Sequence, residues 1–201
     1  ESGHAILGIL TGSDPIHKVT IIPRGRALGL TMQLPVEEKH IHSKNHWLNQ
    51  IQILYGGHLA EEMKFGDVTT GSGNDISRAS DIARKMVTEW GMSEKLGPVS
   101  FGRKDEQIFL GREISQHRDF SEATAQVIDQ EVDSIIKFCV SEARNKLQQN
   151  RDLFETMARN LIERESLDAA EIKMIIAGEQ LPPIVNNKAH KETQPEVDVT
   201  A

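Results

Sequence analysis

Residues 121–150 read SEATAQVIDQEVDSIIKFCVSEARNKLQQN, and this stretch decides the fold class that we predict. Its apolar residues recur every three or four positions, which is typical of one face of a helix. They are Ala125, Ile128, Val132, Ile135, Ile136, Cys139, Ala143 and Leu147. Asn150 is the predicted cap of a further helix to about Arg164, and Asp168 with Glu171 forms a capping-box pattern for another. The second half of the chain is therefore expected to be wholly helical.

The first half mixes helices with a small amount of sheet. A β-branched run at residues 18–22, bounded by two prolines, predicts a strand. The Gly-rich residues 24–35 suit an extended edge segment better than a central strand. Helical periods appear at residues 1–10, 43–65 and 74–90. Gly56 and Gly57 would permit a kink or a close backbone approach within the second of these. We expect a mainly α chain with a small β-sheet near the N-terminus.

The composition excludes several classes of protein. The 201 residues carry 23 Lys and Arg against 30 Asp and Glu, a net charge of −7, which does not suit a general nucleic-acid binder. The single cysteine, Cys139, cannot form an internal disulfide and lies on the apolar stripe, where we expect a core residue. The apolar runs reach about six residues, far short of the roughly 20 that span a bilayer. There is no phosphate-binding Gly-x-x-x-x-Gly-Lys-Ser/Thr motif.

Two short patterns could place ligands on a metal ion. Glu1-x-x-His4 matches the second part of the zinc-peptidase motif His-Glu-x-x-His, but the same spacing recurs at Glu37-x-x-His40, so spacing alone does not assign a function. Asp75 opens a helix after a Gly/Ser loop. Its carboxylate could stabilise the helix N-terminus or bind a cation, and the residues alone leave both readings open.

A histidine cluster forms a second candidate. His42 and His46 are four residues apart and would share a metal ion if both were helical, with His40 nearby. Charged residues surround the cluster, which favours a solvated, histidine-rich turn over a metal site. On spacing alone, Glu61 and Glu62 form a solvated acidic helix face.

Several longer segments acquire meaning from their order along the chain. They are ESGHAILG (1–8), HKVTIIPRGRALGLTMQLP (17–35), GGHLAEE (56–62), TTGSGNDISRASDIARKMV (69–87) and WGMSEKLGP (90–98). In this order they closely resemble the zinc metallopeptidase domain of the FtsH family of ATP-dependent membrane proteases. The resemblance extends to about residue 180 and includes FLGREIS (109–115) and IDQEV (128–132).

The resemblance implies a role for each matching residue. Glu1 would be the general base that accepts a proton from the attacking water, and His4 and Asp75 would be zinc ligands. Glu61 would be a carboxylate that orients a ligand histidine. An edge strand would hold the substrate by β-augmentation, which needs only backbone hydrogen bonds. The edge strand would comprise Ala27, Leu28, Gly29, Leu30, Thr31, Met32 and Gln33.

The chain departs from the family pattern in two places. The first zinc-ligand histidine of the motif would stand directly before Glu1, and we expect the longer protein to carry it there. His58 occupies a position where the family more often has arginine, which we expect to alter surface or subunit contacts rather than the chemistry.

The resemblance also predicts the organisation of the chain. Residues 1–184 would form the peptidase domain, with a zinc-site part at 1–120 and a helical part at 121–184, followed by a disordered tail at 185–201. The family's ATPase module and membrane anchors find no match here, so we expect this fragment alone to be soluble.

The function implied by the resemblance is that of a zinc endopeptidase with one Zn²⁺ per subunit, in an ATP-driven, processive protease. That protease would be a homohexamer in the bacterial inner membrane, with its peptidase part on the cytoplasmic side. It would degrade misassembled membrane proteins and unfolded or short-lived soluble ones. Two alternatives stay open at this point: an inactive, ring-forming scaffold and a helical metal sensor that uses the histidine cluster.

Overall fold

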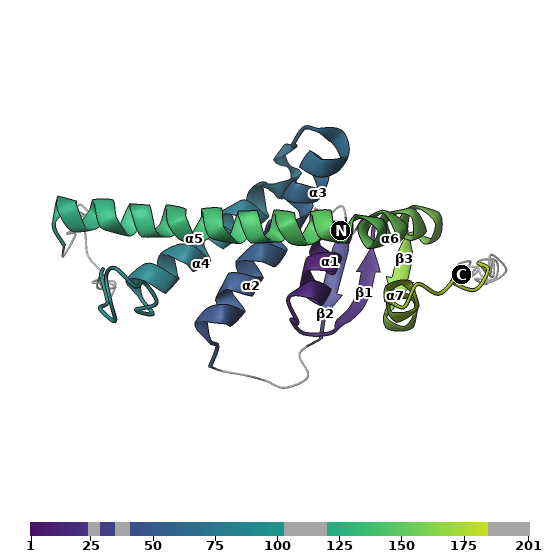
Figure 1. The fold of residues 1–201 in the computed structure, drawn as a ribbon, viewed down its shortest axis with the longest axis horizontal. Helices are drawn as coiled ribbons and strands as arrows, with labels where there is room; N and C mark the ends of the chain where they lie inside the picture. Colours follow the sequence, from purple (N-terminus) through teal and green to yellow (C-terminus); the bar gives the residue numbers. More distant parts are fainter. Residues whose placement is uncertain (24–28, 35–40, 103–119, 185–201) are drawn as a thin grey trace, which may run out of the picture.

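The computed structural model describes residues 1–23, 29–34, 41–102 and 120–184. In these ranges the chain forms helices around a three-stranded sheet, as predicted (Figure 1). No helix in this part of the chain combines the length and the apolar character that a bilayer crossing requires. The predicted tail at 185–201 lies outside the described residues, and the proposed domain boundaries stay a prediction.

Helix α1 (Ser2–Leu10) lies at the centre of the first half and packs against several other helices. It ends at Thr11, and Gly12 follows with φ +64°, the left-handed stop that the sequence predicted. Six of its nine residues are buried. Its start is in direct backbone contact with a second helix, because a Cβ atom on Gly3 would lie 2.1 Å from the carbonyl oxygen of Gly56.

The sheet is antiparallel, with strand order β2-β1-β3. Its strands are β1 (Ile16–Thr20), β2 (Leu30–Gln33) and β3 (Ser166–Asp168). Val19 is opposite Thr31 on one side and Leu167 on the other. Within the described residues, β2 pairs with β1 alone, so the prediction of an extended edge segment is confirmed for Leu30–Gln33. The predicted bounds of the first strand were two residues too late, and β3 was missed because three residues are too few to show an alternating pattern.

The stretch predicted as one helix over 43–65 is two helices. Helix α2 (Lys44–Leu54) and helix α3 (Gly56–Phe65) meet at Tyr55. The side chain of Ser43 caps α2 by accepting a hydrogen bond from the amide of His46. The break falls where two glycines remove the side chains that would keep α3 away from α1, so the close approach is the reason that one helix becomes two.

The predicted Gly/Ser loop before Asp75 contains a short helical turn and the start of the next helix. A 3₁₀ turn, η1 (Thr70–Ser72), leads into α4 (Gly73–Thr88), one residue earlier than predicted. Helix α4 ends two residues before the predicted residue 90, and Gly91 follows with φ +60°. A Cβ atom there would lie 2.8 Å from the Cα atom of Pro98, so the turn also requires glycine for space.

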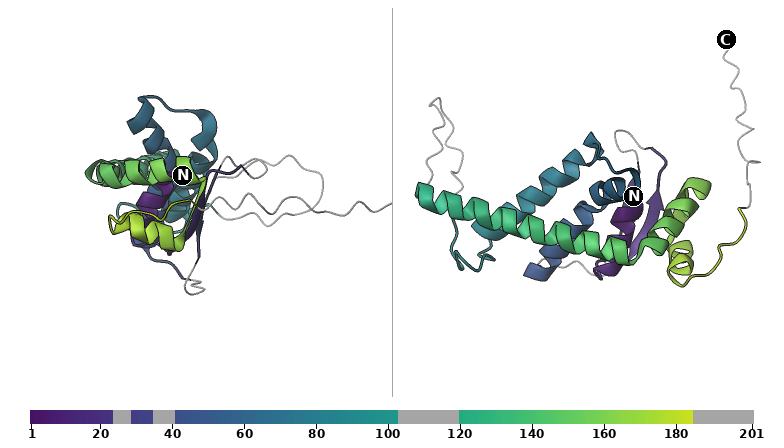
Figure 2. Two further views of the ribbon diagram at one scale, coloured as in Figure 1. Left: turned by 90° about the vertical axis from the view of Figure 1, so that its right-hand side faces the viewer. Right: turned by 45° about the horizontal axis from the view of Figure 1, so that its top comes forward.

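The second half is helical apart from the short β3, and it forms one side of the body (Figure 2). It contains α5 (Glu122–Gln149), α6 (Arg151–Arg164) and α7 (Ala169–Ile176). The capping box of Asp168 with Glu171 is confirmed at α7. Asn150 does precede α6, but its side chain donates backwards to the carbonyl of Lys146 and so closes α5 instead of capping α6. Cys139 is fully buried on α5, as expected.

The helices share one core with the sheet. Buried side chains from helices α1 to α7 and from strands β1 and β3 pack in a single cluster. Its largest fully buried members include Ile6, Leu7, Ile51, Leu59, Met86, Leu147 and Met157. The core therefore fixes α1, α3 and α4 relative to one another, and these helices carry Glu1, His4, Glu61 and Asp75.

Candidate metal centre

His4 is held with one ring nitrogen directed into the protein. Its Nδ1 atom lies 2.8 Å from the carbonyl oxygen of Ile53, at the end of α2. A carbonyl can only accept, so Nδ1 carries the proton and the lone pair of the neutral imidazole is on Nε2. A backbone carbonyl in this position is the usual partner that fixes the tautomer of a metal-binding histidine. The side chain is 18% exposed, so Nε2 can be reached from outside.

Asp75 meets that nitrogen from the first turn of α4. Its Oδ2 atom is 3.4 Å from Nε2 of His4, and its Oδ1 atom is 4.0 Å from Nη1 of Arg78. A carboxylate at this position is stabilised by the partial positive charge at the helix N-terminus. The sequence offered a helix-start acid or a cation ligand, and the geometry is compatible with both roles at once.

The separation between these two atoms suits a shared metal ion. Ligand atoms bound tetrahedrally to zinc at about 2.0–2.2 Å lie about 3.3–3.5 Å apart. The 3.4 Å between His4 Nε2 and Asp75 Oδ2 falls in that range, and nitrogen plus carboxylate oxygen is a donor set that zinc accepts. Within the described residues, no group of three or more His, Cys, Asp or Glu side chains converges on one point.

Gly57 determines where the His4 ring can lie. A Cβ atom on Gly57 would be 2.8 Å from Nε2 of His4 and 3.4 Å from its Cε1 atom. The Nε2 side of the imidazole therefore lies close against the α3 backbone, and any larger residue at 57 would push it away. Gly56 and Gly57 were expected from the sequence to permit a kink or a close backbone approach. The contact between Gly57 and His4 was not predicted.

Glu1 lies between α1 and the edge strand. Its carboxylate oxygen Oε2 accepts a 2.6 Å hydrogen bond from Oγ1 of Thr31. The backbone of Gly29 comes so close that a Cβ atom there would be 2.6 Å from Oε1 of Glu1. Glu1 and His4 are three residues apart, which places them on the same side of a helix.

Glu61 binds the loop that precedes Asp75 through hydrogen bonds. Its two carboxylate oxygens accept hydrogen bonds from the amide of Thr69, at 2.9 Å, and from the Thr69 hydroxyl, at 3.1 Å. Both ring nitrogens of His4 already face other groups. Glu61 is expected to orient a ligand histidine, and this role stays a prediction that concerns the histidine expected before Glu1. In the structure, Glu61 anchors the loop at Thr69 to α3.

Comparison with known protein families matches residues 1–175 to peptidase family M41. The chain belongs to this family. Among curated relatives, the ATP-dependent zinc metalloprotease FtsH of Acidobacterium capsulatum is 55% identical over 185 residues, which are 92% of this chain and 29% of that protein. The protein of the same name from Magnetococcus marinus is 52% identical over 89% of this chain and 27% of its own length. FtsH 4 of Sorangium cellulosum is 50% identical, with coverages of 90% and 28%.

The resemblance drawn from the sequence is thus confirmed at the level of the family. The chain spans less than a third of the length of these relatives. Membership in family M41 covers the whole helical body, including α5 and α6, and ends within α7.

The edge strand of this M41 chain is only partly described. Ala27 and Leu28 lie outside the described residues, whereas the segment from Gly29 to Gln33 runs beside Glu1. Leu30 and Met32 are each 37% exposed, and Thr31 between them points inward to the carboxylate. The strand therefore presents one apolar and one polar side at the place where Glu1 lies.

Two other histidine predictions have different outcomes. His58 lies 3.3 Å from the hydroxyl of the buried Ser72, just before Asp75, so it contacts the interior of this loop. His42 and His46 stack with ring centroids 4.1 Å apart, but His42 precedes the cap of α2 and is not helical. The condition for a shared metal ion at that pair was that both be helical, and it is not met. His40 lies outside the described residues.

Proposed function

We propose that this chain is the zinc-dependent endopeptidase part of an ATP-driven, processive protease. The single observation that carries the proposal is the pair formed by His4 Nε2 and Asp75 Oδ2, 3.4 Å apart, with His4 fixed in the metal-binding tautomer by Ile53. The names of the M41 relatives, which are zinc metalloproteases, support the same assignment.

His4 and Asp75 would hold one Zn²⁺ per subunit together with a histidine before Glu1. When bound, zinc acts as a Lewis acid on the scissile carbonyl and lowers the pKa of a coordinated water to about 7. Asp75 contributes a negative charge that offsets part of the charge of the cation. The carbonyl of Ile53 holds the His4 ring in place, so the ligand does not have to reorient when the ion binds.

Glu1 would serve as the general base and then as the general acid. Its carboxylate accepts a proton from the attacking water as the water oxygen bonds to the scissile carbon. The same proton is then given to the nitrogen of the leaving amine, so the carboxylate is regenerated when the peptide bond breaks. Thr31 donates to Oε2 and leaves the second oxygen, Oε1, to exchange the proton.

The edge strand would bind the substrate chain. In the part of the chain that the structure describes, β2 pairs with β1 alone, so its other edge offers backbone groups for an added strand. Backbone pairing is independent of side-chain identity, which suits unfolded polypeptides as substrates. The apolar side chains of Leu30 and Met32 flank this edge.

The proposed function also implies partners and a location for the whole protein. The M41 chain would be part of a homohexamer, with the helices after Ser121 packing subunits together. A region outside this chain would anchor the protein in the bacterial inner membrane, with the peptidase on the cytoplasmic side. Misassembled membrane proteins and unfolded or short-lived soluble proteins would be its substrates. The alternative of an inactive ring-forming scaffold receives no support, because the M41 relatives are named zinc metalloproteases.

The test uses the full-length protein and casein as an unfolded substrate. We expect about one zinc ion per chain by elemental analysis, and a chelator should stop cleavage. Glu1→Gln should keep the zinc and lose cleavage, because it removes the base and not a ligand. Asp75→Asn should weaken zinc retention. Full-length protein that holds no zinc, or the reverse pattern in the two variants, would overturn the proposal.

A further inference from the structure

Thr31 makes the shortest described contact to the candidate base. Its hydroxyl is 2.6 Å from Oε2 of Glu1 and 3.4 Å from the backbone oxygen of the same residue. A hydroxyl has one proton to donate, so the shorter contact is the hydrogen bond. A length of 2.5–2.7 Å is typical of a hydroxyl that donates to an ionised carboxylate, and such bonds are about twice as strong as neutral ones.

The surrounding backbone leaves Glu1 little freedom. On one side, Gly29 approaches its side chain within the distance at which a Cβ atom would overlap Oε1. Thr31 itself is fixed by its pairing with Val19, which is fully buried in the central strand. The carboxylate is thus clamped between the start of α1 and a strand that is registered against the core.

We propose that Thr31 is a positioning residue, which holds the Glu1 carboxylate with Oε1 directed at the reacting water and couples the base to the substrate-binding strand. The inference rests on the proposed function of Glu1 and β2. A substrate strand added to the outer edge of β2 would be placed relative to Thr31, and Thr31 is bonded to the base. The same strand therefore sets the position of both the peptide bond and the group that transfers the proton.

The expected size of the effect follows from geometry. A reacting group displaced by about 1 Å can lose about 100-fold in rate, because proton transfer requires close and aligned atoms. Without the Thr31 hydroxyl, Glu1 keeps its charge and its place on α1 but can rotate about its side-chain bonds. The loss should therefore appear in kcat, whereas substrate binding through the backbone of β2 should change little.

A purely structural role for the hydroxyl would give a different result. If Thr31 only tied β2 to α1, its removal would loosen the edge strand, raise KM and lower thermal stability. Thr20 offers a matched control in the same sheet, because its buried hydroxyl donates to the carbonyl of Glu165, away from Glu1. Thr20→Val should reduce stability without a specific loss in kcat.

The experiment compares Thr31→Val, Thr31→Ser, Thr20→Val and Glu1→Gln in the full-length protein. Cleavage of a short fluorogenic peptide gives kcat and KM, and zinc content and the thermal midpoint are measured on the same samples. We expect Thr31→Val to keep its zinc and a KM within about twofold of wild type, and to lose about 10–100-fold in kcat. Thr31→Ser should recover most of the loss, because serine retains the hydroxyl.

The outcomes separate this inference from the function on which it rests. If Glu1→Gln abolishes cleavage but Thr31→Val keeps its kcat, only the inference is overturned. A rise in KM with unchanged kcat, loss of zinc in Thr31→Val, or no rescue by serine would also overturn it. Cleavage that survives in Glu1→Gln would overturn both the proposed function and the inference.

Discussion

Two regions of the molecule gather histidines, and they do so in opposite ways. At the metal centre, His4 donates from one ring nitrogen to a buried carbonyl and presents the other to Asp75. At the far end of α2, which we call the tryptophan end, His42 and His46 stack on each other. The tryptophan end also comprises Trp47 and Trp90, whose rings stack. Its polar members are Ser93, Glu94, Lys95 and Glu131; Glu131 accepts a hydrogen bond from Ser93 and pairs with Lys95, and Glu94 pairs with Lys44.

The difference shows what a histidine needs in order to bind a metal ion. By sequence spacing, both regions were candidates for a metal site, since His42 and His46 are four residues apart and Glu1 and His4 are three apart. In the folded chain, His4 has a carbonyl that fixes its tautomer and a carboxylate at ligand distance. At the tryptophan end, the histidine rings contact each other and the edge of Trp47, which is packing. The neighbours of the ring, and not the sequence spacing, distinguish the two.

Gly57→Ala should produce the largest contrast between the two regions. The new methyl group would lie within 2.8 Å of Nε2 of His4, so the ligand must move. We expect zinc affinity to fall by about 10–100-fold, the range seen when the support of a metal ligand is disturbed. Stability of the metal-free protein should change less, because the better helix propensity of alanine offsets part of the cost of moving the ring. Zinc titration and thermal unfolding of the metal-free protein measure the two effects.

Gly73→Ala is the matched control for Gly57→Ala. It also lies in the first turn of a helix, but a Cβ atom there would meet nothing within 4 Å. Its zinc affinity should equal that of the wild type. Equal affinities for both variants would show that the His4 ring is not confined by α3.

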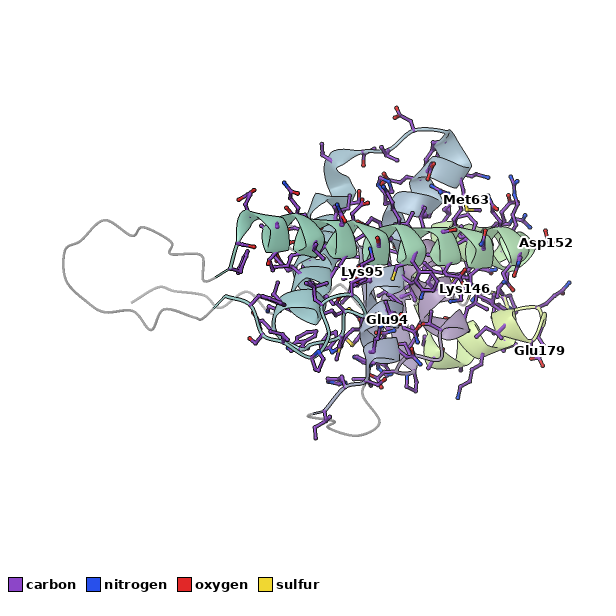
Figure 3. The ribbon with its side chains drawn as sticks, turned by 60° about the vertical axis from the view of Figure 1, so that its left-hand side comes forward. Met63, Glu94, Lys95, Lys146, Asp152 and Glu179 are labelled. Carbon is purple, nitrogen blue, oxygen red and sulfur yellow. The ribbon has the colours of Figure 1, made fainter. Side chains whose placement is uncertain are left out.

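Glu131→Gln should affect stability at the tryptophan end and leave zinc binding intact. Glu131 is buried on α5, accepts a 2.8 Å hydrogen bond from Ser93 and lies 3.0 Å from Nζ of Lys95 (Lys95 is labelled in Figure 3). We expect a loss of about 1–3 kcal/mol in the free energy of unfolding, because the charged hydrogen bonds join α5 to the loop after α4. Urea unfolding at neutral pH measures it. Asp133→Asn, which removes an exposed pair with Lys137, should cost less than about 0.5 kcal/mol.

The pH dependence of that loss has a definite sign. Burial alone would raise the pKa of Glu131, but the Ser93 hydroxyl and the Lys95 ammonium outweigh it and hold the pKa below its ordinary value of 4.5. A lowered pKa stabilises the folded state fully above the ordinary value, and this contribution is lost as the pH falls through the folded value. The difference between wild type and Glu131→Gln should therefore shrink below about pH 4.5. A difference that grows on acidification would contradict the assignment.

The sequence predicted most where a pattern is local. The long periodic run after Ser121 and the capping box at Asp168 both follow from neighbours a few residues away, and both are confirmed. Strand β3 is an exception within that half, because its pairing partner Val19 lies far away in the chain. Asn150 could also have capped either of two helices, and only packing decides between them.

The candidate site could be predicted only in part, because its residues come from segments that are distant in sequence. The family resemblance pointed to Glu1, His4 and Asp75, and the structure brings His4 and Asp75 together. The carbonyl of Ile53 and the backbone of Gly57 could not be found in this way, since a carbonyl has no sequence signature and a glycine has many uses. The first contact depends on how α1 packs against the end of α2, and the second on how closely α1 approaches α3.

The smallest effect is expected when His42 and His46 are both replaced by alanine. If the stacked rings are packing at the protein surface, their loss should cost about 0.5–1.5 kcal/mol in the free energy of unfolding. Zinc content and peptide cleavage of the full-length protein should stay at wild-type levels, because neither ring reaches the metal centre. A drop of one zinc ion per chain in this variant would place the metal at the tryptophan end. It would show that the hydrogen bond between His4 and the carbonyl of Ile53 only stabilises the packing of the two helices. The double variant therefore tests the difference between the two regions where no loss of zinc is expected.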